Sequence, residues 1–221
     1  MADEDREQDY LFKEIDEEVR QDRYMVLVRK YGVHGVVLAV VLVAAVAGYK
    51  GWQSYDLGLR QERSEKFSGA LRALDENKTA DAERALRALS TEGSGAYAYL
   101  ARFRQAALQG RGGTKSVAVA EYLKLAQESD LDKIFRDLAL LQATLLELDD
   151  GDPEKLSTRL AGLSEGNNPW RHSAMEMSAL LAHRTGDAKK AQKLFKELAD
   201  DASAPLGIRG RAAEMTTILG G

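Results

Sequence analysis

Residues 186–198 read GDAKKAQKLFKEL and carry the most regular helical pattern in the chain. The apolar residues Ala191, Phe195 and Leu198 are four and three positions apart, so their side chains share one face of a helix. Gly186 stands five positions before Ala191 and suits a tight turn into that helix. The segment therefore predicts a helix that packs by one apolar face and follows a short turn.

The same spacing occurs three more times upstream. In each copy a small or aliphatic residue is followed by bulky residues four and seven positions later, and a turn-forming residue stands five positions before the first. The copies are Ala82/Leu86/Leu89 after Asn77, Ala118/Tyr122/Leu125 after Gly113, and Leu156/Leu160/Leu163 after Gly151. The steps between copies are 36, 38 and 35 residues. Such a period is typical of helical hairpins that stack because none can bury its apolar face alone.

These segments resemble the second helix of a tetratricopeptide repeat, which has a small residue, an aromatic residue four later and a proline near the end. Residues 172–205 match best and end in Ala204-Pro205. The first-helix signature is largely missing, and Leu156 replaces the usual small residue, so the resemblance implies degenerate repeats. A generic helical bundle is the alternative. We expect an all-α chain in which residues 50–221 form an α-solenoid of degenerate helical hairpins.

The last predicted helix, residues 205–219, has the pattern of a terminal cap. Its outer side is polar through Arg209, Arg211 and Glu214. Its inner, apolar side is expected to contain Leu206, Ile208, Ala212, Met215 and Ile218.

An uncharged run, YGVHGVVLAVVLVAAVAGY, occupies residues 31–49. As a helix it is about 28 Å long, close to the hydrocarbon thickness of a bilayer. Tyr31, Tyr49 and Trp52 stand at its ends, where aromatic side chains prefer the membrane interface. A buried core helix of a soluble protein is the alternative, but such a helix normally keeps a polar stripe, and residues 35–48 have none. We predict a single transmembrane helix over residues 31–49.

The sequence also bears on whether this predicted helix is cleaved and on its orientation in the membrane. Ala45-Val46-Ala47 reads as a signal-peptide cleavage site, but residues 1–30 carry six positive and ten negative side chains, unlike a basic leader. A retained anchor is favoured, with cleavage after Ala47 left open. Arg29-Lys30 before the span against Lys50 after it favours a cytoplasmic N-terminus and a translocated body. Residues 1–30 are interpreted as a solvated, partly disordered tail, with an amphipathic docking helix as the alternative.

The sequence contains no catalytic or metal-binding motif of the common types. There is no cysteine, so disulfides, thiolate metal sites and a cysteine nucleophile are excluded. His172 and His183 lack a carboxylate pair at ligand spacing, and the acidic run 149–152 lacks the glutamate of a calcium loop at Leu160. The charges after residue 49 cancel, 25 of each sign, which disfavours nucleic acid. We predict no catalytic, cofactor or metal site, no small-molecule substrate and no nucleic-acid partner.

A surface that binds other proteins is then the remaining candidate for a functional site. Tetratricopeptide arrays bind protein segments along the face built by their first helices, here residues 97–108 and 133–148. Aromatic and arginine side chains are the usual anchors of protein interfaces. The richest cluster of such residues, and our candidate partner-binding site, is Tyr99, Arg102, Phe103 and Arg104. The alternative is that Phe103 belongs to the core and the arginines are solvated.

The chain as a whole also resembles a known bacterial family. The resemblance covers nearly the whole chain and is most specific over about residues 10–75. It rests on the acidic stretch FKEIDEEVRQDRYMVLVRKYG at residues 12–32, on VAGYKGWQSY at residues 46–55, and on the degenerate repeats that follow. On these residues the chain resembles the YfgM-like family of tetratricopeptide repeat-like, ancillary subunits of the SecYEG translocon. The resemblance implies an inner-membrane protein with residues 1–30 cytoplasmic and residues 50–221 periplasmic. It also implies association with the Sec translocon and a membrane-anchored periplasmic chaperone of the PpiD type.

The function expected is that of a membrane-tethered protein–protein interaction module that assists export or folding of periplasmic proteins. The alternative is a scaffold or assembly subunit of another bacterial inner-membrane complex. An enzyme would need a polar pocket, for example around His172 or His183.

Overall fold

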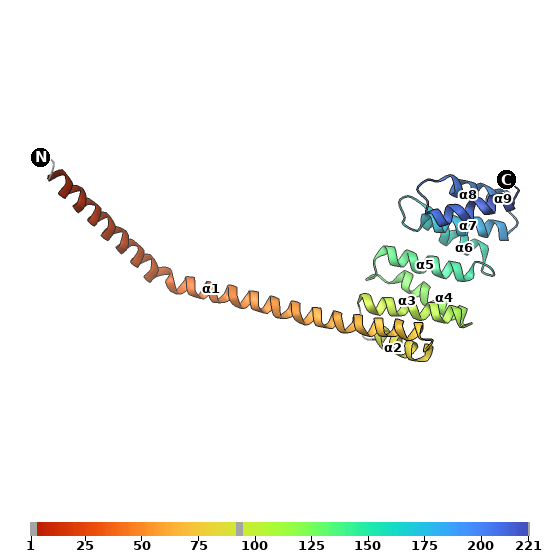
Figure 1. Ribbon diagram of the computed structural model, residues 1–221, viewed down its shortest axis with the longest axis horizontal. Helices are drawn as coiled ribbons and strands as arrows, with labels where there is room; N and C mark the ends of the chain where they lie inside the picture. Colours follow the sequence, from red (N-terminus) through yellow and green to blue (C-terminus); the bar gives the residue numbers. More distant parts are fainter. Residues whose placement is uncertain (1–3, 92–94, 221) are drawn as a thin grey trace. The chain divides into compact units, whose positions relative to one another are not determined.

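The computed structural model describes residues 4–91 and 95–220, except the side chains of residues 4–24, 26–28 and 39. This part of the chain is helical and contains no strand. The helices are α1 (Glu4–Asp75), α2 (Thr79–Thr91), α3 (Ala96–Arg111), α4 (Lys115–Gln127), α5 (Lys133–Glu147), α6 (Pro153–Ser164), α7 (Arg171–Arg184), α8 (Ala188–Asp200) and α9 (Leu206–Ile218) (Figure 1). The predicted all-α class is confirmed.

The chain divides into two compact units, Met1–Glu62 and Arg63–Gly221, called here the N-terminal unit and the repeat unit. In the N-terminal unit the backbone is already helical from Glu4 onward, although a solvated tail was the favoured interpretation of residues 1–30. The side chains that would form the apolar face of a docking helix there, such as Phe12 and Ile15, lie outside the described part. The repeat unit begins within α1 and contains all later helices.

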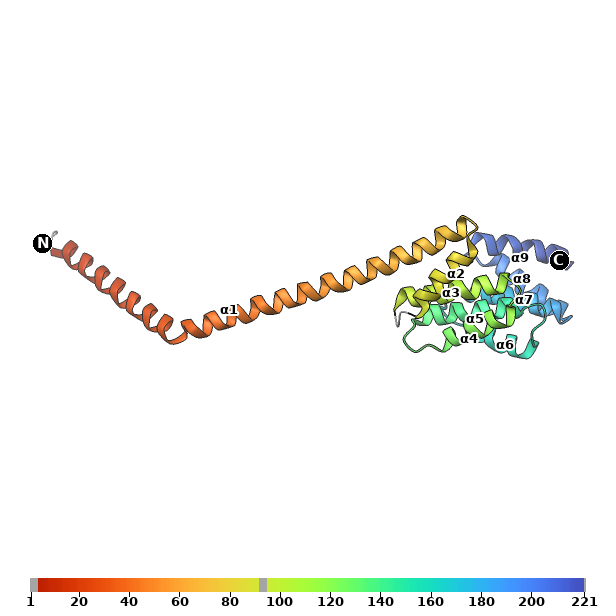
Figure 2. The ribbon, with the colours of Figure 1, turned by 90° about the horizontal axis from the view of Figure 1, so that it is seen from below.

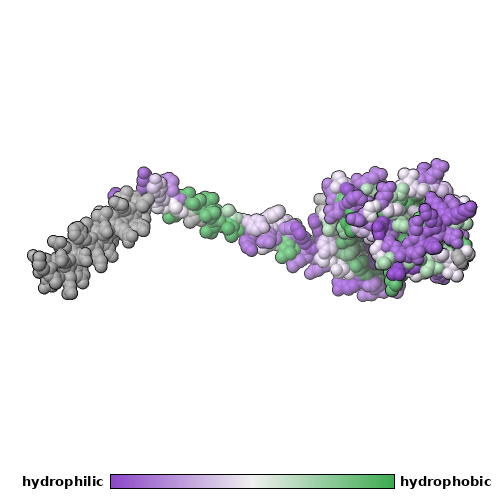
Figure 3. Space-filling model, turned by 90° about the horizontal axis from the view of Figure 1, so that it is seen from above, coloured by the Kyte–Doolittle hydropathy of each residue, from purple (hydrophilic) through white to green (hydrophobic). Residues whose placement is uncertain are grey.

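The predicted span lies in the middle of α1. Its large apolar side chains between Tyr31 and Tyr49 are between 54% and 71% exposed. A helix in the core of a soluble protein would bury these groups, since burying one valine or leucine stabilises a fold by about 1.5–3 kcal/mol. The stretch Arg29–Asp75 includes a window that is long and apolar enough to cross a membrane. Figure 3 shows this apolar band on the face of α1 that it displays.

The repeat unit is a stack of antiparallel helical hairpins in chain order (Figure 1 and Figure 2). Each helix from α2 to α8 packs against the next. Ala70, near the end of α1, belongs to the same buried cluster as Leu86 and Leu89 of α2. All twelve residues of the four repeated triplets are buried, none more than 4% exposed. The spacing that predicted an α-solenoid therefore marks the inner face of α2, α4, α6 and α8.

The turns before these helices follow the prediction in three of four repeats. Asn77, Gly113 and Gly186 have positive φ angles of 60°, 86° and 82°, which the left-handed turn requires. Gly151 is different, because its φ is not positive and its need for glycine is steric. A Cβ at this position would lie 2.7 Å from the backbone oxygen of Glu147, at the end of α5.

Gly151→Ala is therefore expected to destabilise the protein by about 1–3 kcal/mol, since the new methyl group must displace backbone at the α5–α6 turn. Gly162→Ala is the matched control. Gly162 lies inside α6 with open space around its Cβ position, so alanine is expected to stabilise by up to about 1 kcal/mol through helix propensity. Thermal unfolding followed by circular dichroism measures both changes, and equal effects would contradict the steric explanation.

The register of the last helix was predicted only in part. Ile208 and Ala212 are buried as expected, and Met215 packs against them. Leu206 and Ile218 are 80% and 66% exposed, so their placement on the inner face was wrong. The face that packs continues at spacings of four, three and four residues and reaches Leu219 instead of Ile218.

Candidate interaction groove

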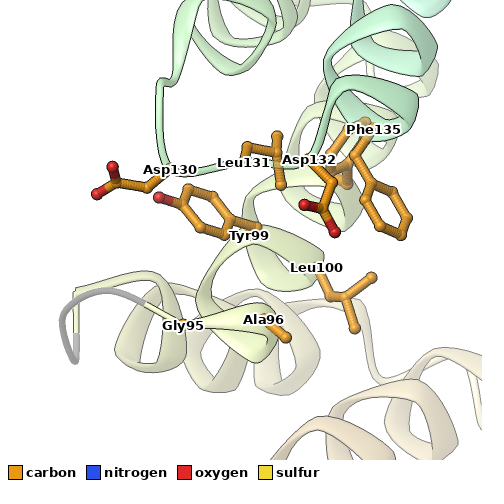
Figure 4. Close-up of a pocket in the computed structure, with 9 residues that line it drawn as sticks. Gly95, Ala96, Tyr99, Leu100, Asp130, Leu131, Asp132 and Phe135 are labelled. Atoms are coloured by element: carbon orange, nitrogen blue, oxygen red, sulfur yellow. The ribbon is translucent and has the colours of Figure 1, made fainter.

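A groove of about 420 Å³ opens on the repeat unit between the first half of α3 and the loop that joins α4 to α5. Figure 4 shows side chains from both walls directed toward it. Its lining is mostly apolar. The lining residues are Gly95, Ala96, Tyr99, Leu100, Phe103, Asp130, Leu131, Asp132 and Phe135.

The wall on α3 follows from helical spacing. Ala96, Tyr99, Leu100 and Phe103 are three, one and three positions apart, which puts them on one face. On the opposite face of α3 the small residues Ala98 and Ala101 are buried. Small residues on the packed face let neighbouring helices come close, while the large side chains of α3 remain at the groove.

The opposite wall is a loop that internal contacts fix in place. Arg136 donates to the backbone oxygens of Glu128 and Ser129, both at 3.3 Å, which ties the start of α5 to the end of α4. Arg102 of α3 donates to the Glu128 carboxylate at 2.5 Å. Leu131 is 7% exposed and belongs to the core between α3, α4 and α5. The loop is therefore a rigid wall.

The structure places the four candidate residues in three different settings. Tyr99 and Phe103 line the groove, and Phe103 also packs on the ring of Tyr122, with centroids 5.8 Å apart. Arg102 is used internally, because its Nε donates to Glu121 at 2.6 Å while another nitrogen bonds Glu128. Arg104 is exposed, four positions beyond Leu100.

Sequence reasoning did not find the residues of the second wall. Asp130, Leu131 and Asp132 precede α5, and Phe135 lies in its first turn. α5 has a strongly apolar sequence, and Phe135 at its start remains 40% exposed. The sequence does contain an indication of this wall: two adjacent large apolar residues, Ile134-Phe135, at the start of the first helix of a repeat.

Arg102 stabilises the wall of the groove through its two ion pairs with Glu121 and Glu128. We therefore expect Arg102→Gln to lower the free energy of unfolding by about 1–2 kcal/mol, because two carboxylates lose a charged donor. The matched control is Arg84→Gln. Arg84 pairs with Asp81 at the surface, with 79% of its side chain exposed, and its loss should cost less than about 0.5 kcal/mol. Thermal unfolding of both variants makes the comparison. Equal shifts would show that the α3–α4 ion pairs hold nothing in place.

A second cluster of polar side chains joins α7 to the loop after α8. His172 Nε2 lies 3.0 Å from Asp201 Oδ2 and 3.5 Å from Ser203 Oγ. A catalytic triad needs the carboxylate and the nucleophile on different ring nitrogens, and here both approach the same one. Hydrogen bonds from Ser203 and then His172 hold the pKa of Asp201 well below its usual range. The cluster therefore fastens the loop.

No group of three or more metal-ligating side chains occurs among the described residues. The surface of the repeat unit is largely hydrophilic in the view of Figure 3, which also shows a strip of hydrophobic surface in a hollow. The groove with its exposed Leu100 and Phe135 is thus the best-formed candidate for binding.

A family model described as a tetratricopeptide repeat-like domain matches residues 28–206. The matched region covers the apolar run of α1 and every hairpin up to the start of α9. No match was found among the curated proteins.

Proposed function

The chain belongs to the tetratricopeptide repeat-like domain family, and from this premise we propose that it is a membrane-tethered protein–protein interaction module without catalytic activity. Repeat arrays of this type typically act as interaction scaffolds. The single observation that carries the proposal is the preformed apolar groove of about 420 Å³ beside α3. It exposes Phe135, one of the aromatic side chains that are enriched in protein interfaces, next to the apolar side chain of Leu100.

The membrane tether is supported by the composition and exposure of α1. An uncharged helical run whose large side chains are more than half exposed needs an apolar environment, which a bilayer supplies. Arg29-Lys30 on one side and Lys50 on the other favour a cytoplasmic N-terminus. We propose a single-pass bacterial inner-membrane protein with residues 1–30 cytoplasmic, residues 31–49 in the bilayer and residues 50–221 periplasmic.

For the partners, we propose the Sec translocon and a periplasmic chaperone of the PpiD type, with a role in the export or folding of periplasmic proteins. The support is the resemblance of residues 12–32 and 46–55 to the YfgM-like subunits, together with the repeats that follow them. The alternative is a scaffold or assembly subunit of a different inner-membrane complex. Both use the same fold, so the partner decides between them.

Affinity purification of the full chain in mild detergent, followed by mass spectrometry, tests the proposal. Translocon subunits and a periplasmic chaperone at near-stoichiometric recovery are expected. A chain with the span scrambled but of unchanged composition serves as the control for detergent carry-over. Recovery of another envelope complex without Sec components would reject the translocon assignment and leave the scaffold alternative.

A further inference from the structure

The groove beside α3 has an acidic rim that the protein leaves unpaired. Asp130 and Asp132 line it from the α4–α5 loop, and neither forms an ion pair with any described residue. Asp132 occupies the N-cap of α5 but its side chain accepts no capping hydrogen bond. Among the described residues, Asp130 accepts only from the hydroxyl of Ser129, at 3.2 Å. Two carboxylates two positions apart are thus available at an apolar surface.

Three positive side chains near the loop wall, Lys133, Arg136 and Arg102, are held by partners inside the protein. Lys133 pairs with Asp137 at 2.5 Å, and Arg136 donates to the carbonyl oxygens that end α4. Arg102 pairs with Glu121 in α4 and with Glu128 directly after α4. On the α3 side, the guanidinium of Arg63 lies beside Gly95, 3.4 Å from the position of a Cβ there. The loop wall of the groove is therefore negative.

We propose, on the basis of the interaction function above, that this groove binds an extended partner segment in which a large apolar side chain is flanked by lysine or arginine. The apolar residue enters between Leu100 and Phe135, which are 37% and 40% exposed. In Figure 4 the Asp132 carboxylate lies next to both of these side chains. A cationic residue on one side of the apolar residue can then approach Asp132, and a cationic residue on its other side, past Tyr99, can approach Asp130 (Figure 4).

The composition of the groove favours such a segment over a small metabolite. Small-molecule sites combine an enclosed apolar cavity with convergent polar groups that fix the ligand. Here the polar groups are two like charges at the rim of an open groove, which select by charge and leave orientation to the apolar contact. An acidic segment would be repelled by the same aspartates, so the groove discriminates against it.

The experiment uses the full chain in detergent micelles and three fluorescent peptides on a Gly/Ser background. Their centres are Lys-Phe-Lys, Glu-Phe-Glu and Lys-Ala-Lys. Fluorescence anisotropy is expected to show the Lys-Phe-Lys peptide binding at least about tenfold more tightly than either of the others. Its affinity should also fall with added salt, since exposed charges are screened.

Matched variants locate the site. Asp130→Asn with Asp132→Asn is expected to weaken the Lys-Phe-Lys peptide about fivefold and to remove most of its salt dependence. Leu100→Ala with Phe135→Ala should weaken binding without altering the salt dependence. The control is Asp149→Asn with Asp200→Asn, which removes two exposed aspartates outside the groove and should change neither affinity nor salt dependence.

Equal binding of the lysine and glutamate peptides, or indifference to the Asp130 and Asp132 substitutions, overturns the proposal. If the groove variants alter only self-association in analytical ultracentrifugation, a second copy is the occupant and the proposal is wrong. The same variants in the detergent purification separate the two hypotheses. Sec components recovered regardless of the groove, with no peptide preference, reject this inference alone. Peptide selectivity without Sec recovery rejects only the translocon assignment.

Discussion

A chain that begins at Arg63 is expected to be recovered in the soluble fraction with its repeat unit folded, whereas a chain that begins at Thr79 is expected to be strongly destabilised. The first truncation removes the apolar run and the exposed Trp52 and Tyr55 that follow it, none of which the repeat unit needs. The second also removes the part of α1 that carries Ala70.

The difference comes from the first hairpin. Ala70 is 1% exposed and packs with Leu86 and Leu89 of α2 and Ala101 of α3, with Phe67 at the edge of this cluster. Without this stretch of α1, one side of α2 faces water. Burying a leucine side chain stabilises by about 1.5–3 kcal/mol, so partial exposure of two leucines should cost about 2–4 kcal/mol.

Membrane fractionation, circular dichroism and thermal unfolding of the two truncations are the measurements. The circular dichroism spectrum of the full chain in detergent is the reference. The helical signal expected from the deleted part of α1 is subtracted from it before it is compared with each truncation. If the chain from Arg63 is insoluble or unfolded, anchor and repeat unit are not separable. If the chain from Thr79 melts at the same temperature as the longer one, the end of α1 is not part of the first hairpin.

The sequence was sufficient to predict the helices and their packed faces because that information is local. A side chain four or seven positions along a helix lies on the same face whatever the rest of the chain does. Ala82, Leu86 and Leu89 were thus identified as buried without knowledge of their neighbours, and the structure confirms it. Stacking then follows, since each hairpin must cover its apolar face.

The groove could not be predicted in the same way because its walls, α3 and the α4–α5 loop, come from segments that are distant in sequence. Arg102 pairs with Glu121 and Glu128, 19 and 26 positions away, and no local pattern indicates that these ion pairs withdraw Arg102 from the surface. Tyr99 and Phe103 could be identified as anchors by residue type. Phe135 could not, because its position in the groove depends on how the α4–α5 loop packs beside α3. Helix ends are similarly hard to predict: Ile218 and Leu219 are adjacent, and one residue decides which is packed.

Phe195→Ala is expected to be the most destabilising single substitution in the repeat unit, with a loss of about 3–5 kcal/mol. Phe195 is 1% exposed and lies at the centre of the cluster between α7, α8 and α9. Four of its buried neighbours are alanines, Ala179, Ala182, Ala191 and Ala212. These short side chains are fixed to helix backbones and have no flexible atoms that could fill the space, so the cavity remains open.

The loss should be local as well as large, because each hairpin of a repeat array contacts only its neighbours. Hydrogen exchange measured on the variant is expected to show faster exchange over α7–α9 and nearly unchanged protection in α3 and α4. Leu206→Ala is the control: Leu206 is 80% exposed at the start of α9, and its loss should change stability by less than about 0.5 kcal/mol. Uniformly faster exchange from α3 to α9 would mean that the array unfolds as one cooperative unit, and the nearest-neighbour account of its stability would then be wrong.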